Sequence, residues 1–210
     1  MSAKNMNTVV KKERKNKQSG VALLEMLIVI GIIGLLTAGV VVLSTSTFSS
    51  LDELKVVNNM STVKTKLQKV FKQQGNYAGL TNATSVDFLG ENDLSNPYGV
   101  DIQLGTAVTN GQADGGFSMS VGGLSEASCV NVMSTLDGNS FDFVGLRTGA
   151  AGAAATPLSS TSDIAGDVAD VDPEYVAGAS VVKDLTVINI TADCKVAAAN
   201  NNAIIVTGAY

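Results

Sequence analysis

The chain has 210 residues, a formal net charge of −5 and no histidine. This length suits one folded domain with an accessory segment. The acidic balance argues against nucleic-acid binding, because phosphate contacts require lysine and arginine. Without histidine, the commonest general base and the triads that use it are absent, and no glycine-rich phosphate-binding loop follows a strand pattern. We therefore predict a protein that is not an enzyme and needs no cofactor.

Positive charge is concentrated at the N-terminus. Residues 1–20 carry six basic side chains and a single acid, Glu13. Residues 26–43 contain no charged side chain, and these 18 residues are long enough to span a bilayer as a helix. Because basic residues flank the cytoplasmic end of a membrane helix, we expect the N-terminus in the cytoplasm and everything after residue 43 outside it.

Three common kinds of N-terminal segment match only part of this pattern. A cleaved signal peptide has a shorter apolar region that ends in a small-x-small site, which is missing here. A lipoprotein signal needs a cysteine, and none lies near residue 20. A plain signal anchor accommodates the length and stays an alternative. It gives no reason for Glu25, whose carboxylate costs up to roughly 3 kcal/mol in an apolar membrane segment.

The sequence KQSGVALLE at residues 17–25 resembles the type IV prepilin motif, in which a glycine ends a basic leader and a glutamate is the fifth residue of the mature chain. The resemblance implies that a membrane-embedded prepilin peptidase cleaves after Gly20. It also implies that the same enzyme, acting as a methyltransferase, methylates the new amine at Val21. Residues 1–20 would then be the leader, cleaved from the mature subunit.

Glu25 is the residue that this resemblance assigns to assembly. Cleavage would create a cationic amine at Val21, and a lone cation or a lone carboxylate is costly among apolar helices. The two groups could neutralise one another between neighbouring subunits. We therefore expect Glu25 to guide the docking of an incoming subunit and to set its register.

One long helix is expected from residue 21 to about residue 74, with Gly75 as the residue that closes it. Residues 21–50 would form its transmembrane and assembly half, and residues 51–74 the amphipathic half at the start of the globular head, 51–210. Apolar residues at spacings of three and four predict one buried stripe: Val56, Met60, Val63, Leu67 and Val70. The helix also carries lysines that are either solvated or face acidic surfaces of neighbouring heads: Lys55, Lys64, Lys66, Lys69 and Lys72.

The rest of the chain predicts an α+β fold, in which the long N-terminal helix packs on an antiparallel sheet as in the type IV pilin fold. Residues 76–96 form an irregular connection, which the resemblance identifies as the family's αβ-loop. A short helix is expected at residues 126–136 with Ser125 as N-cap. Strand patterns lie in the sheet region, 100–210, at residues 100–108, 117–121, 141–146, 185–190 and 203–207.

The two cysteines, Cys129 and Cys194, both fall in the part that we expect outside the cytoplasm. Such a pair usually forms a disulfide in an oxidising compartment, and two separately buried thiols are the alternative. The resemblance to type IV pilins implies that the two cysteines enclose the segment that the family calls the D-region. Within it, the Gly-, Ala- and Ser-rich residues 149–162 predict a flexible surface loop. No CxxC spacing indicates a metal site.

One acidic cluster could supply oxygen ligands to Ca²⁺. Its members are Asp163, Asp167, Asp170, Asp172 and Glu174. The glycine of an EF-hand loop is missing and Pro173 interrupts the run, so a solvated acidic loop is the better interpretation. We predict no metal site.

The pilin subclass is indicated by the leader, by the first mature residue and by a short sequence in the head. Three features resemble type IVb major pilins of Gram-negative bacteria, the toxin-coregulated and colonisation-factor type. They are a mature chain that begins with Val21, a leader of 20 residues and the sequence LSEASC at 124–129. The resemblance implies a subunit that the pilus assembly machinery polymerises with itself into an extracellular fibre for adhesion or aggregation. A minor pilin, a type II secretion pseudopilin and an anchored binding domain that never polymerises are the alternatives.

Overall fold

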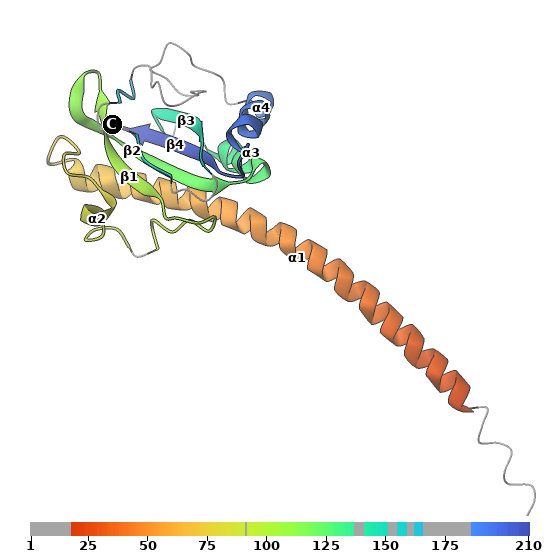
Figure 1. The fold of residues 1–210 in the computed structure, drawn as a ribbon. Helices are drawn as coiled ribbons and strands as arrows, with labels where there is room; N and C mark the ends of the chain where they lie inside the picture. Colours follow the sequence, from red (N-terminus) through yellow and green to blue (C-terminus); the bar gives the residue numbers. More distant parts are fainter. Residues whose placement is uncertain (1–17, 91, 137–140, 151–154, 159–161, 166–185) are drawn as a thin grey trace, which may run out of the picture. The chain divides into compact units, whose positions relative to one another are not determined.

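The computed structural model describes residues 18–90, 92–136, 141–150, 155–158, 162–165 and 186–210. The chain divides into two compact units, Met1–Phe48 and Ser49–Tyr210. In chain order the described elements are α1 (Gln18–Phe71), α2 (Asn82–Ser85), β1 (Gln103–Thr109), β2 (Gln112–Leu124), α3 (Glu126–Thr135), β3 (Phe143–Thr148), α4 (Val187–Ala197) and β4 (Ala203–Ala209) (Figure 1).

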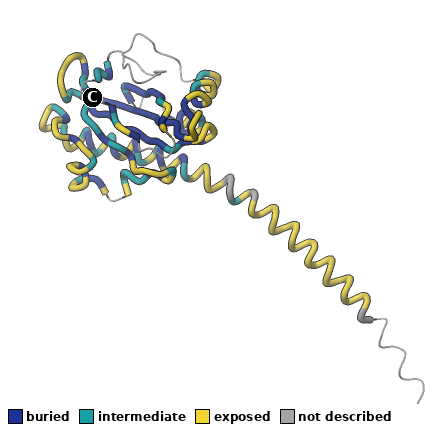
Figure 2. Tube along the Cα trace, in the orientation of Figure 1, coloured by how far each residue is buried: buried dark blue, intermediate teal, exposed yellow. Residues whose placement is uncertain are grey.

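In the first unit, α1 is apolar and exposed. The segment Gly20–Val41 is a helix of 22 residues with the length and composition to cross a membrane. Its residues are exposed throughout (Figure 2), and they include leucine, isoleucine and valine side chains that are half or more accessible. A continuous apolar surface of this length is unfavourable in water, so it requires lipid or other protein chains around it.

In the second unit, four strands form one antiparallel sheet in the order β1-β2-β4-β3. The last strand of the chain, β4, is therefore central, and its Val206 lies opposite Ser120 of β2 and Gly145 of β3. The predicted α+β class with a long N-terminal helix and an antiparallel sheet is confirmed.

The main core lies between the sheet and the amphipathic part of α1. Four residues of the predicted stripe, Val56, Met60, Val63 and Leu67, have no exposed surface. The fifth, Val70, was predicted wrongly: it is 46 % exposed. In this last turn Phe71 makes the inward contacts instead, with Tyr77 and Phe88 at centroid distances of 5.3 and 6.0 Å.

The helix closes as the glycine at position 75 predicts. The described α-helix ends at Phe71, three residues before the predicted end. Gly75 has a φ of +76° and donates its backbone N–H to the Phe71 carbonyl at 3.1 Å. A residue without a Cβ adopts this left-handed conformation at least cost.

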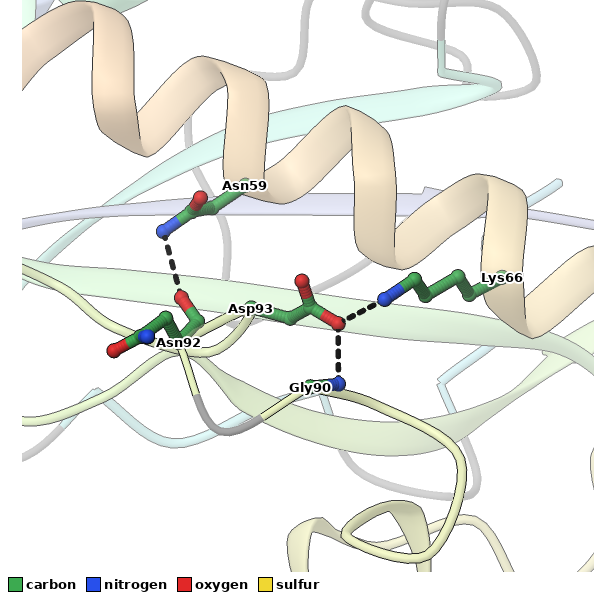
Figure 3. A network of polar contacts seen from close by, with 5 residues as sticks. All are labelled: Asn59, Lys66, Gly90, Asn92 and Asp93. Carbon is green, nitrogen blue, oxygen red and sulfur yellow. Dashed lines mark hydrogen bonds and ion pairs between the residues drawn. The ribbon is translucent and has the colours of Figure 1, made fainter.

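The connection that follows α1 is tied back to it by polar contacts (Figure 3). The Asn59 side-chain amide donates to the backbone carbonyls of Asn92 and Ser95 at 3.3 and 2.8 Å. Lys66 forms an ion pair with Asp93, whose carboxylate also accepts the Gly90 N–H at 2.5 Å. The connection contains the short helix α2, which sequence analysis missed.

The opposite face of the sheet is covered by part of the D-region. All seven residues of β4 are buried, so neither face of the central strands is left to solvent. Within residues 149–162, expected as a flexible surface loop, Ala155 and Leu158 are each only 3 % exposed. They pack in a second core with Ile164 and with sheet residues that include Phe143, Ile204 and Val206. These residues are buried because the sheet is apolar on both faces and needs a covering layer on each.

The prediction of a strand at residues 185–190 is wrong. From Val187 this stretch is the start of α4, and the Thr186 hydroxyl accepts the N–H of Asn189 as an N-cap. The buried residues Ile190, Cys194 and Ala197 recur at helical spacing. The β-branched residues favoured a strand, but burial of this face beside α3 decides for a helix.

The other predicted elements of the head are present with shifted ends. α3 begins after Ser125, whose hydroxyl accepts the N–H of Ser128 at 3.2 Å. β2 begins five residues before the predicted strand, because Asn110 and Gly111, with φ of 51° and 76°, form the tight turn of a β1–β2 hairpin. An Asn-Gly pair between two strand patterns is a recognised hairpin signal that our sequence analysis did not use.

Candidate assembly site

The predicted cleavage point lies in the first turn of α1. Gly20 and Val21 are helical, and Val21 is 68 % exposed. A Cβ added at Gly20 would meet no atom within 4 Å. Packing within the described chain therefore gives no reason for a glycine at this position.

Glu25 stands one helical turn after Val21, on the same face of α1. It is exposed, and within the described residues it has no hydrogen bond or ion pair. Its neighbours on the helix are apolar side chains such as Leu24 and Ile28, which are 60 % and 54 % exposed. Glu25 is therefore a single carboxylate on an accessible apolar helix segment. In lipid such a carboxylate is energetically unfavourable unless a positive charge pairs with it.

Three glycines mark open positions along the same helix. A Cβ at Gly31, Gly34 or Gly39 would meet no atom within 4 Å. Small residues on an apolar helix let another helix approach closely. This part of α1 thus has an apolar surface, a carboxylate and three glycines at which another helix can approach closely. None of these features makes a tertiary contact within the described chain.

Cys129 and Cys194 form a disulfide that joins α3 to α4, with a Cα–Cα distance of 5.8 Å. Both cysteines are fully buried. The predicted pairing is confirmed, and the alternative of two separate thiols is wrong.

The acidic cluster is described only at Asp163. Its carboxylate accepts the N–H groups of Asn110 and Gly111 at 3.0 and 2.9 Å, and that of Ala165 at 3.0 Å. Asp163 thereby fastens the β1–β2 turn to the D-region, a role that sequence analysis missed. The other members, Asp167, Asp170, Asp172 and Glu174, lie outside the described residues. Among the described residues, no group of three or more His, Cys, Asp or Glu could hold a metal.

Known proteins share both the N-terminal segment and the head. A family model described as the prokaryotic N-terminal methylation motif matches residues 15–41. The toxin coregulated pilin of Vibrio cholerae serotype O1 is 30 % identical over 184 residues, which cover 82 % of this chain and 78 % of that protein. The chain belongs to the type IV pilin family.

Two further comparisons agree with this assignment. Another toxin coregulated pilin of Vibrio cholerae is 28 % identical to this pilin over 150 residues, 66 % of either chain. The crystal structure of TcpA, a type IV pilin from the El Tor biotype of Vibrio cholerae, superposes with a TM-score of 0.59 at 22 % identity. The superposition covers 76 % of this pilin and 99 % of that chain. The predicted type IV pilin fold and the resemblance to the toxin-coregulated type are therefore confirmed.

Proposed function

We propose that this pilin is made as a precursor, cleaved between Gly20 and Val21 and polymerised into an extracellular type IVb pilus. Residues 21–50 hold it in the bacterial inner membrane before assembly, with the leader in the cytoplasm. Its partners are the prepilin peptidase and methyltransferase, the pilus assembly machinery and further copies of itself. The assembled fibre serves adhesion or aggregation.

The observation that carries this proposal is Glu25, which lies on the exposed apolar part of α1 and has no hydrogen bond or ion pair within the described residues. A membrane anchor needs only apolar side chains, and a carboxylate makes its insertion into lipid less favourable. A helix that leaves lipid to pack among other copies can offset this cost, because each carboxylate meets the N-methylated amine of a neighbouring copy. Glu25 therefore favours assembly over permanent anchoring.

The role of Glu25 is tested by Glu25→Ala in the full chain, expressed in the producing cells. We expect processed pilin with N-methylvaline at residue 21 by mass spectrometry, and no fibres by electron microscopy. Thr37→Ala is the matched control, since Thr37 bonds only to the Gly34 carbonyl of its own helix, at 2.9 Å, among the described contacts. Normal fibres from Glu25→Ala would contradict the proposed role.

Labelling with an antibody to residues 76–210 separates the remaining alternatives. We expect label along whole fibres, the result for a major subunit. Label at fibre tips alone would indicate a minor pilin, and label on cells without fibres a non-polymerising anchor. Short periplasmic assemblies in place of surface fibres would indicate a secretion pseudopilin.

A further inference from the structure

Glu53 is a buried carboxylate in the head, and its partners among the described residues are all neutral. Its side chain lies on α1 and the residue is 7 % exposed. It accepts a hydrogen bond from the Asn131 side-chain amide of α3 at 3.0 Å, and a longer one from the Ser49 hydroxyl at 3.4 Å. No cation of the described chain contacts it. Buried charges are ordinarily paired, because an uncompensated one loses its hydration.

Glu53 also lines an open pocket of about 370 Å³ between α1 and α3. Leu54, which is 49 % exposed, forms an apolar wall beside the carboxylate. The other lining residues are polar: Ser50, Asn131, Ser134 and Thr135. The pocket thus combines an apolar wall, hydroxyl groups and a carboxylate.

A lysine side chain has the matching chemistry. Its methylene stem packs against an apolar wall, and its ammonium group has three protons to donate to a carboxylate and to hydroxyl oxygens. Arginine is not the donor from another copy, because the chain has only Arg14, in the leader, and Arg147. The Arg147 guanidinium already donates to the Thr156 carbonyl.

Of the five lysines at residues 55–72, two are free to serve: Lys69 in the last turn of α1, and Lys72 directly after the helix. Three others make contacts in their own chain: Lys55 with Ser95, Lys64 with the Phe141 ring, and Lys66 with Asp93. Lys69 and Lys72 are exposed and have no hydrogen bond or ion pair in the described part of the chain. They lie 16 and 19 residues after Glu53, about 24 and 29 Å at the helical rise per residue. Neither can reach Glu53 of its own chain.

We propose that the pocket between α1 and α3 binds the ammonium group of Lys69 or Lys72 from a second copy of this pilin. The inference rests on the proposed function, since it is a contact between subunits of a fibre. The donor and the acceptor lie at different ends of the α1 segment in the head, so the contact is heterologous. Such a contact can repeat from copy to copy into an open helical assembly.

A zero-length carbodiimide cross-linker, which joins carboxylates to amines already in contact, tests the pairing in purified fibres of the full chain. We expect dimers and higher multimers that resist denaturant, and a tryptic peptide in which Glu53 is joined to Lys69 or Lys72. The distance along the helix makes any such link intermolecular. Coupling of Glu53 to another lysine such as Lys195, or labelling of Glu53 by an added amine equally well in fibres and in unassembled pilin, would overturn the inference.

The substitution Glu53→Gln tests the charge separately from the fold. Glutamine keeps an oxygen for Asn131, so we expect processed pilin at the unaltered level but roughly tenfold fewer fibres, because a buried charge pair loses one partner. Asp52→Asn removes the same charge from the adjacent position outside the pocket and should leave the fibre yield unchanged. Equal yields from the two variants would overturn the inference alone, whereas absence of fibres from the unaltered chain would overturn the proposed function.

Discussion

At the scale of single residues, backbone conformation limits which substitutions the head can tolerate. Gly123 has a φ of +80° and lies in β2 where the register with β4 shifts between Val121 and Leu124. A Cβ at this position would stand 2.4 Å from the Tyr98 carbonyl oxygen, a contact with backbone that cannot rotate away. The glycine is therefore required for two reasons, its left-handed conformation and the close approach of another segment.

Gly123→Ala should lower the free energy of unfolding by about 3 kcal/mol, the combined cost of a left-handed alanine and of a steric clash. Gly111→Ala is the matched control, because Gly111 has a φ of +76° but open space around its Cα. There we expect only about 1 kcal/mol. Urea unfolding of the detergent-solubilised pilin, followed by circular dichroism, measures both values, and equal losses would contradict the steric argument.

At the scale of elements, the connection between α1 and β1 depends on a few polar contacts with the helix. The hydrogen bond from Lys66, supported by the N–H of Gly90, holds the pKa of Asp93 below its ordinary value in spite of partial burial. A carboxyl whose pKa is lowered on folding stabilises the folded state at pH values above its unfolded pKa. That stability is lost as the pH falls through the folded pKa.

Asp93→Asn should reduce stability at pH 7 by about 0.5–1 kcal/mol, a modest value because Lys66 is 39 % exposed to screening by solvent. The difference from the unaltered pilin should shrink once the pH falls below about 3.9, where the unfolded carboxyl is protonated. Asp101→Asn is the control, since Asp101 is exposed and its carboxylate has no partner in the described chain. Thermal unfolding at pH 7 and pH 3 measures the effect, and a pH-independent difference would contradict it.

At the scale of the whole molecule, the head is a sheet with a covering layer on each face. One layer comes from α1, the other from the described D-region residues around Leu158 and Ile164. The disulfide between Cys129 and Cys194 closes the chain segment that supplies this second layer together with β3. Loss of the disulfide should therefore affect the whole head and not one helix.

The double substitution Cys129→Ala and Cys194→Ala should cost about 4 kcal/mol of unfolding free energy, as for a loop closed across 65 residues. Alanine leaves no polar group in the buried site. Chemical denaturation of the solubilised pilin measures the loss, and a reducing agent should lower the stability of the unaltered protein towards that of the variant without changing the variant. A double variant as stable as the unaltered protein would contradict this role.

The features that sequence analysis predicted correctly depend on neighbours in the chain. The α1 stripe from Val56 to Leu67 follows from helical spacing, and the start of α3 follows from the cap at Ser125. The prepilin resemblance needed only residues 17–25. Each of these patterns is complete within a few helical turns, so a single segment carries the whole signal.

The sequence by itself thus determined the apolar N-terminal helix and the α+β class of the head, and it predicts a cleaved leader. Only the tertiary structure decided that Val187–Ala197 is a helix, that Leu158 lies in the core, and that the Asp163 carboxylate binds a hairpin turn. It alone placed Glu53 beside Asn131 in a pocket. The physical reason is that burial and hydrogen bonding at these positions come from residues distant in the chain, and such contacts can outweigh local preference.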